Sequence, residues 1–429
     1  MRVWLITTGE PLPVDGPHAR LLRTGLLGNA LVARGHEVVR WDSTFDHARK
    51  RHRFAEDSSV QLDERYTLRL LHSIGYPHNV SLRRWLNHRG VARAFARQAP
   101  SEPAPDVVLC SLPTVELCTA ATAYAGKRSI PVVIDVRDMW PDIFLDLVPT
   151  WSRRLVRPVL APTFGAARRA LSNAAAVCGH APGFVEWGLG LASRTRTRWD
   201  RDFPHGYTGK APVAEALAEA KRAWEQSGLR QDGGAFIACF FGMMGKQFEI
   251  ETVIEAARRL ASGERRFRFV LCGAGSNLER YRGLAQGLDK VLFPGWVDAA
   301  SIWSLMQMSA VGLAPYRSTR SFTLSIPNKS IEYLCAGLPV VSSLAGALED
   351  LLAEHDCGLT CANGSPEALA SILCNLYDDP QRREAMSKNA RALYEARFVA
   401  EKVYAEMSEY LEEIAAAHDR GAARKGSEQ

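Results

Sequence analysis

Short apolar runs alternate along this chain with longer stretches in which apolar residues recur at the spacing of an α-helix. In the first half the expected strands are Val3–Thr7, Glu37–Trp41, Val107–Cys110, Ala120–Ala125 and Val132–Val136, with a helix over Arg20–Arg34. In the second half they are Ala235–Phe241, Phe267–Leu271, Val291–Phe293, Val311–Ala314 and Val340–Ser342, with helices over Glu251–Leu260 and Ala300–Met308. Such alternation predicts parallel sheets with helices on both faces. We therefore expect an α/β protein with two Rossmann-like domains.

The domain boundary is expected at the turn Asp202–Tyr207, which contains Pro and Gly and precedes a helical pattern over 211–226. The prediction is a first domain over residues 1–205, a second over 206–390, a C-terminal helix over 391–416 and a flexible tail over 417–429. Residues 43–80 are long for a simple connection, so they are expected to form an insertion with short elements of its own.

Length and composition fit a folded chain of two domains. The 429 residues are 47% hydrophobic and 23% charged and contain no repeat, which excludes fibrous and largely disordered classes. No apolar run approaches the roughly 18–20 residues of a membrane-spanning helix, and the first run is too short for a signal-peptide core. The nine cysteines include no Cys-x-x-Cys, so we expect reduced thiols and a cytoplasmic protein.

The net charge of +6 is unevenly distributed, because residues 1–210 carry 29 Lys and Arg against 19 Asp and Glu. Arginines alternate with apolar residues at helical spacing in Ser81–Arg97 and Trp151–Arg157. This pattern is typical of a solvated helix face, of a surface for anionic lipids, or of a site for a phosphate-bearing acceptor. Nucleic acid is not expected as a partner, since no binding motif accompanies the charge.

The segment Ser325–Ser343 carries the clearest chemistry. Pro327 suits the first turn of a helix, Gly337 its C-terminal end, and Pro339 prevents its continuation before a strand. The N-terminus of such a helix offers free N–H groups to a phosphate, and Glu332, about one turn in, could accept hydrogen bonds from ribose hydroxyls.

This segment, Pro-Asn-Lys-x-x-Glu-Tyr-x-x-x-Gly-x-Pro-Val-Val, resembles the donor-site motif of glycosyltransferase family 4, and within it the WbuB-like branch that acts on bacterial surface polysaccharides. Supporting stretches are Arg34–Val38, Val136–Pro141, Pro204–Tyr207, Phe241–Lys246, Cys272–Gly275 and Pro294–Val297. The resemblance implies the GT-B fold, in which two Rossmann-like domains face a central cleft and a C-terminal helix crosses back to the first domain. It also implies a retaining mechanism.

For the second domain the resemblance implies a set of donor-binding residues. They are Gly242, Trp296, Val297, Ser325, Asn328, Lys329 and Glu332, joined from the first domain by Gly16. The first glutamate of the family motif is absent, since Leu324 stands there, and the usual basic pair is replaced by Met243 and Phe248. Lys246 is the cation of that loop and is expected to neutralise the leaving diphosphate.

The first domain is expected to bind the acceptor. The loop Gly9–His18 follows the first strand, where the family has a glycine-containing loop near the donor phosphates, and His18 and Arg23 are the predicted acceptor residues. Arg137 and Asp138 end a strand within a motif similar to the branch's Arg-Asp-Leu-Trp-Pro. Because ligands bind at the carboxyl edge of such sheets, we expect both to take part in catalysis.

Three weaker signals are not expected to mark sites. Gly273-Ala-Gly275 imitates a dinucleotide fingerprint without its third glycine, and Asp200-Arg-Asp202 matches a metal motif without a preceding strand. Cys357 and Cys361 lack a second pair at the spacing of a zinc site. No metal and no cofactor are expected.

The sequence thus predicts a retaining glycosyltransferase, cytoplasmic or peripheral at the inner face of the cell membrane. Its donor would be a nucleotide sugar, UDP-linked, and its acceptor a glycan or a lipid-linked glycan. Two alternatives stay open: a nucleotide-sugar epimerase of the same fold, and a non-catalytic sugar-nucleotide-binding subunit of an assembly complex.

Overall fold

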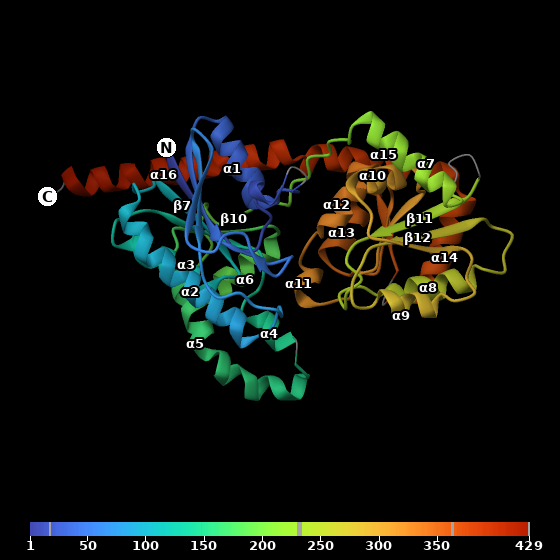
Figure 1. The fold of residues 1–429 in the computed structure, drawn as a ribbon, viewed down its shortest axis with the longest axis horizontal. Helices are drawn as coiled ribbons and strands as arrows, with labels where there is room; N and C mark the ends of the chain where they lie inside the picture. Colours follow the sequence, from blue (N-terminus) through green and yellow to red (C-terminus); the bar gives the residue numbers. More distant parts are fainter. Residues whose placement is uncertain (17–18, 147, 230–233, 362–363, 428–429) are drawn as a thin grey trace. The chain divides into compact units, whose positions relative to one another are not determined.

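The computed structural model describes residues 1–16, 19–146, 148–229, 234–361 and 364–427 and divides the chain into two compact units (Figure 1). Unit 1 comprises Met1–Gly206 and Ala400–Gln429, and unit 2 comprises Tyr207–Val399. The division falls inside the turn where the boundary was expected. Each unit is built on its own sheet, so the prediction of two Rossmann-like α/β domains is confirmed.

In the described part of unit 1, eight strands form one sheet. Their order is β10 (Arg201–Asp202), β9 (Ala176–Gly179), β8 (Val132–Val136), β7 (Val107–Leu112), β1 (Arg2–Ile6), β2 (Glu37–Ser43), β6 (Tyr66–Leu71) and β5 (Ser58–Asp63). All pairs are parallel except β5 with β6. The expected insertion over 43–80 therefore adds an edge hairpin to the sheet, and it also forms the short hairpin β3 (Phe45–Asp46) and β4 (Arg51–His52).

Helices cover both faces of this sheet (Figure 1). One face carries α1 (Arg23–Ala33) and α16 (Ala400–Ser427), and the other carries α2 (Leu82–Gln98), α3 (Val115–Gly126), α5 (Arg153–Ser172) and α6 (Pro182–Ala192), with the short α4 (Asp142–Asp146) nearby. Alternate residues of β1 serve the two faces: Val3 packs with residues of α1 and α16, whereas the ring of Trp4 lies 6.1 Å from that of Phe95 in α2. Such two-sided burial explains why the strands read as continuous apolar runs.

Two expectations for unit 1 were wrong in detail. Ala120–Ala125 is the second half of α3 rather than a strand, because small residues such as alanine fill a buried helix as readily as a strand and periodicity alone does not separate the two. The C-terminal helix α16 runs from Ala400 to Ser427, so most of the segment expected as a flexible tail is helical. As predicted, this last helix belongs to the first domain, where Arg34 pairs with Glu412 at 2.7 Å.

Unit 2 contains a six-stranded parallel sheet within its described residues. The order is β13 (Val291–Gly295), β12 (Phe267–Cys272), β11 (Phe236–Phe241), β14 (Val311–Ala314), β15 (Val340–Ser342) and β16 (Gly358–Thr360). The helices are α7 (Ala214–Gln226), α8 (Ile250–Arg259), α9 (Leu278–Leu284), α10 (Ala299–Met308), α11 (Arg320–Thr323), α12 (Asn328–Cys335), α13 (Ala347–Glu354), α14 (Pro366–Asp378) and α15 (Pro380–Arg397). Every strand expected here is confirmed to within two residues.

Among the described residues, none of the helices combines the length and apolar character that crossing a bilayer requires.

Candidate functional site

The carboxyl edge of the unit 2 sheet gathers the loops that the sequence singled out for donor binding. Gly242 follows β11, Gly273 follows β12, Trp296 follows β13, and α12 begins near the end of β14. Parallel α/β sheets bind ligands at this edge, because the loops there converge and helices begin there.

Glycines allow the loops after β11 and β12 to touch backbone to backbone. A Cβ on Gly273 would lie 1.8 Å from the carbonyl oxygen of Gly242, and one on Gly275 would lie 2.7 Å from that of Met244. Both glycines have positive φ angles, +147° and +153°, which other residues rarely adopt. The Gly-Ala-Gly sequence is thus accounted for by close packing of two loops.

Lys329 places a positive charge at the end of β11. Its side chain is buried, with 8% of the residue exposed, and its ammonium donates a hydrogen bond to the carbonyl oxygen of Phe241. A Cβ on Gly242 would lie 2.5 Å from Nζ, so the ammonium rests against the Gly242 backbone. The rings of Phe240, Phe241 and Phe248 surround it at 4.8, 4.9 and 5.3 Å from their centres. The structure therefore brings together Lys329 and Gly242, two of the predicted donor residues.

Glu332 lies one turn further along α12 and is also buried, with 6% of the residue exposed. Burial raises the pKa of the nearby Tyr316 phenol, and the negative charge of Glu332 raises it further. The helix begins as predicted, with Pro327 at its N-terminal boundary and Gly337, at a φ of +67°, after its last turn. A buried carboxylate near the start of a helix suits hydrogen-bond donors of a ligand.

The other predicted residues of unit 2 differ in exposure. Lys246 and Asn328 are exposed, Trp296 is 76% exposed at the end of β13, and Val297 is half-buried. The hydroxyl of Ser325 donates to the carbonyl oxygen of Phe322 at 3.1 Å. An exposed indole beside a sheet edge is available for stacking on a planar ring.

Sequence reasoning missed Arg317, which follows β14 at the same edge. Its backbone N–H donates to the carbonyl oxygen of Gln247 at 2.9 Å, so it lies beside the loop that contains Lys246. Its side chain is exposed. A basic residue in the loop after a short buried strand was the signal that could have found it. Phe248, by contrast, is buried against Phe240, with ring centres 5.0 Å apart.

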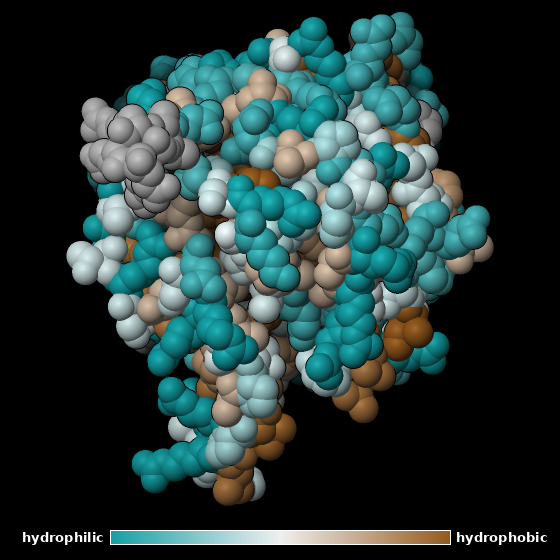
Figure 2. Space-filling view, turned by 90° about the vertical axis from the view of Figure 1, so that its left-hand side faces the viewer, coloured by the Kyte–Doolittle hydropathy of each residue, from teal (hydrophilic) through white to brown (hydrophobic). Residues whose placement is uncertain are grey.

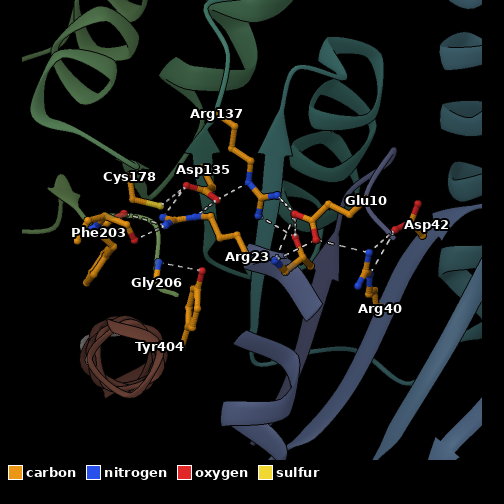
Figure 3. Close-up of polar contacts among 12 residues, drawn as sticks. Glu10, Arg23, Arg40, Asp42, Asp135, Arg137, Cys178, Phe203, Gly206 and Tyr404 are labelled. Carbon is orange, nitrogen blue, oxygen red and sulfur yellow. Dashed lines mark hydrogen bonds and ion pairs between the residues drawn. The ribbon is translucent and has the colours of Figure 1, made fainter. Parts of the chain in front are cut away.

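At the carboxyl edge of unit 1 a chain of buried ion pairs surrounds Arg137 (Figure 3). Its guanidinium pairs with Glu10, with Asp135 at 2.8 Å, and donates to the Thr24 hydroxyl at 2.7 Å. Burial alone would raise the pKa of Asp135, but the positive charges of Arg23 and Arg137 hold it well below its usual range. Glu10 is affected in the same sense by Arg137 and Arg40.

Arg23 belongs to this network as well. It binds both carboxylate oxygens of Asp135, at 2.8 and 3.1 Å, and donates to the carbonyl oxygens of Phe203 and Pro204 at 2.7 and 3.2 Å. Its side chain is 1% exposed, and all three of its nitrogens are engaged. These contacts fasten the end of the first segment of unit 1 to its sheet, so they give Arg23 a structural task; its predicted role in acceptor binding stays a prediction.

Asp138 lies at the same edge but outside the ion pairs. Burial raises the pKa of this carboxyl to about 6, and the charge of Arg84 opposes the rise. Gly16 has a φ of +122°, and among the described residues no atom lies within 4 Å of its Cβ position. His18 lies outside the described residues.

The rejected signals have structural explanations. The Asp200 carboxylate is buried and accepts hydrogen bonds from the backbone N–H groups of Val177 and Thr197 at 2.8 and 2.7 Å. Cys357 and Cys361 are buried free thiols. In the described ranges no three His, Cys, Asp or Glu side chains form a group that could hold a metal ion.

The fold is that of the two-domain GT-B glycosyltransferases. Sucrose-phosphate synthase from Thermosynechococcus elongatus is similar over 97% of this chain and 99% of its own, with a TM-score of 0.71 and 18% identity. WaaG, a glycosyltransferase involved in lipopolysaccharide biosynthesis, has a TM-score of 0.65 at 14% identity, covering 96% and 99%. Anabaena HepE, solved in complex with UDP and glucose, has a TM-score of 0.63 at 16% identity, covering 96% and 100%.

Sequence comparison points to the same class of protein. Residues 235–379 match the family described as "Glycosyl transferases group 1". The chain is 26% identical over 196 residues to an alpha-D-kanosaminyltransferase of Streptomyces kanamyceticus, covering 45% of this chain and 49% of that protein. It is 32% identical over 135 residues to the D-rhamnosyltransferase WbpZ of Pseudomonas aeruginosa, covering 30% and 34%. The chain thus spans about half or less of these relatives, which are glycosyltransferases by name.

Proposed function

We propose that this protein is a retaining glycosyltransferase of family 4, in the WbuB-like branch. It moves a sugar from a nucleotide-sugar donor, UDP-linked, to a glycan or lipid-linked acceptor of bacterial polysaccharide synthesis. The match of residues 235–379 and the names of the relatives support the reaction class, and the neighbour solved with UDP supports the donor class. No metal is required in this proposal.

One observation carries the proposal: the Lys329 ammonium rests against the backbone of Gly242 where β11 ends. A cation beside a glycine loop and the start of a helix is suited to a diphosphate. Glu332 then accepts from the ribose hydroxyls, and the exposed Trp296 and the half-buried Val297 line the place of the base. Exposed Lys246 is free to follow the diphosphate as it leaves.

The chemistry follows from charge development at the phosphate. The bond between the sugar's anomeric carbon and the diphosphate oxygen breaks, and the acceptor oxygen bonds to the same face of that carbon. The acceptor proton passes to the departing phosphate. Lys246 stabilises the negative charge that grows there, while Asp138 and Arg137 of unit 1 orient the acceptor.

The test is a thermal-shift screen of nucleotide sugars followed by transfer assays with and without acceptors. A donor at 100 times its Kd should stabilise the protein by roughly 2.7 kcal/mol. Formation of an epimer without acceptor would establish the epimerase instead. Donor binding without turnover on any acceptor would establish the non-catalytic subunit.

We further propose a peripheral membrane contact through unit 1, which would place the protein at the inner face of the cell membrane. Trp151, in the turn before α5, and Leu155 and Val159, in the first turns of α5, recur every fourth residue and are 77%, 70% and 77% exposed. Leu82 and Leu86 form a second exposed pair on α2, 71% and 44% exposed. Figure 2 shows hydrophobic residues among hydrophilic ones at the lower end of this side of the molecule.

Arginines lie beside both rows of exposed apolar residues, the one near the start of α5 and the one on α2. Arg153, Arg154 and Arg157 interleave with the row near the start of α5, and Arg89 stacks on Trp85 of α2 at 4.3 Å. Apolar side chains beside cations are the composition that anionic lipid surfaces bind.

A further inference from the structure

Two loops at the carboxyl edge of the unit 1 sheet and the first turn of α2 bring together basic and aromatic side chains that the proposed mechanism does not use. The turn between β3 and β4 supplies His47 and Lys50. The loop before α2 supplies Tyr76 and Asn79, and the first turn of α2 supplies Arg84. None of these residues belongs to the ion-pair network around Arg137.

Contacts join these groups around the Tyr76 ring. Lys50 donates to the side-chain oxygen of Asn79, and Arg84 donates to its carbonyl oxygen at 2.7 Å. The Lys50 ammonium and the Arg84 guanidinium carbon lie 5.0 and 5.7 Å from the centre of the Tyr76 ring. The Tyr76 hydroxyl is 2.7 Å from Nδ1 of His47, which is itself 3.5 Å from the Lys50 ammonium.

Trp140 and His88 hold the Arg84 guanidinium from another direction. Its guanidinium carbon lies 4.8 Å from the centre of the Trp140 ring, and its Nε is 3.4 Å from Nε2 of His88. His88 is 3% exposed, and its Nδ1 has no hydrogen-bond partner in the part of the chain that the structure describes. Asn79 and the two rings therefore fix the position of the cation.

Nearby negative groups do not fully balance the positive charge of this cluster. Burial and the charge of Arg84 lower the pKa of Lys50. Burial, then Lys50 and Arg84, lower the pKa of His47 to about 4, and burial and Arg84 lower that of His88 to about 3. Every one of these groups is thus destabilised in its charged form, which a bound anion would reverse.

The neighbouring carboxylates do not supply that anion. Asp46 is engaged by Arg49 at 3.4 Å and by Arg53 at 3.8 Å. Asp138 acts on Arg84, whose pKa burial nevertheless lowers.

We propose that His47, Lys50, Tyr76 and Arg84 form a binding site for a phosphate group of the acceptor. An ammonium, a guanidinium and a phenol hydroxyl from three elements offer N–H and O–H donors in several directions, which a tetrahedral phosphate accepts better than a planar carboxylate. That the phosphate belongs to an acceptor rests on the proposed function, whereas the phosphate site itself does not.

The test is a calorimetric titration of the full chain with inorganic phosphate, with glucose 1-phosphate and with a polyisoprenyl phosphate in neutral vesicles. Each titration is run with and without UDP. Phosphate bound at the proposed donor site of unit 2 is displaced by UDP and is recognised by its loss. Lys50→Met and Arg84→Met should each weaken phosphate binding at least tenfold. Arg93→Met, an exposed arginine on the same helix, is the matched control and should change it less than twofold.

Preference for the polyisoprenyl phosphate identifies a lipid-linked source, and preference for glucose 1-phosphate a soluble one. Lys50→Met should leave the melting temperature unchanged or raise it, because it removes repulsion from Arg84. If Lys50 had only a structural role, the same substitution would lower the melting temperature. Failure of the wild type to bind any of the three ligands overturns the site, as does an affinity equal to that of the wild type in both the Lys50→Met and the Arg84→Met variants. If the wild type binds phosphate but shows no nucleotide binding or no sugar transfer, the proposed function is overturned and the phosphate site stands.

Discussion

The ammonium of Lys329 lies 5.3 Å from the centre of the Phe248 ring. The family that the sequence resembles usually has a basic side chain at this position, whereas in this chain the Phe248 ring packs beside a cation from α12. Positive charge therefore reaches the end of β11 from a different element, where it is buried and fixed by the carbonyl oxygen of Phe241.

This arrangement separates the roles of two lysines. Lys329→Met should weaken nucleotide binding at least tenfold, because a buried cation at the diphosphate is lost. Lys246→Ala should lower turnover by roughly 10² or more with little effect on nucleotide affinity, since it acts on the developing charge. Calorimetry and steady-state kinetics measure the two effects. Turnover of the Lys246 variant within threefold of wild type would transfer the leaving-group role to Lys329 or Arg317.

Glu332→Ala should weaken nucleotide binding at least tenfold, because a charge-assisted hydrogen bond to the ribose contributes about 1.5–3 kcal/mol. The comparison ligand is inorganic diphosphate, whose affinity should stay the same because it has no ribose. If calorimetry shows equal nucleotide affinity in variant and wild type, with the fold intact, Glu332 does not contact the ribose.

Arg23→Met should destabilise the protein by about 3–5 kcal/mol, because the buried Asp135 carboxylate then keeps Arg137 but loses its ion pair with Arg23. Arg34→Met is the control: its pair with Glu412 is at the surface, where solvent screens it, so its loss should change stability far less than Arg23→Met does. Denaturant unfolding measures both. A stable Arg23→Met variant with a raised KM for acceptor would instead support the direct acceptor contact.

Asp138→Asn should increase stability in a pH-dependent way. The folded protein raises the pKa of this carboxyl from 3.8 to about 6, so it holds the proton more tightly than the unfolded chain does. The resulting penalty is absent below pH 3.8, grows between these values and is complete above about pH 6. The melting temperature of the variant should therefore exceed that of the wild type at pH 7.5 by more than at pH 4.5. An equal difference at both pH values would mean that the carboxyl titrates normally.

Replacement of Trp151, Leu155 and Val159 by serine should abolish sedimentation with anionic vesicles. Binding of the wild type should fall with salt, because attraction to the surface contributes about 1 kcal/mol per basic residue and is screened. Serine at the exposed Val213 and Leu284 of unit 2 is the matched control and should leave binding intact. Equal sedimentation with neutral and anionic vesicles would show that the arginines take no part.

The sequence by itself determined the local elements of this protein. Strand and helix positions follow from the period of apolar residues, and the ends of α12 follow from Pro327 and Gly337, because these signals act over a few residues. The strand predicted at Ala120–Ala125 was wrong because it relied on the same local signal. A short run of small apolar residues has no period that distinguishes a strand from a helix. The family motif likewise directed attention to Lys329 and Glu332.

Only the tertiary structure decided which side chains meet. The ammonium of Lys329 reaches Gly242 across 87 positions of chain, and Arg23 binds an aspartate 112 positions away, contacts that no local pattern encodes. The pairing of Lys50 with Asn79 across two loops is of the same kind. Charge, burial and pKa depend on such long-range neighbours, because they are set by everything within a few ångströms regardless of position in the chain. The sequence could therefore name candidate residues, while their chemical environment was decided by the fold.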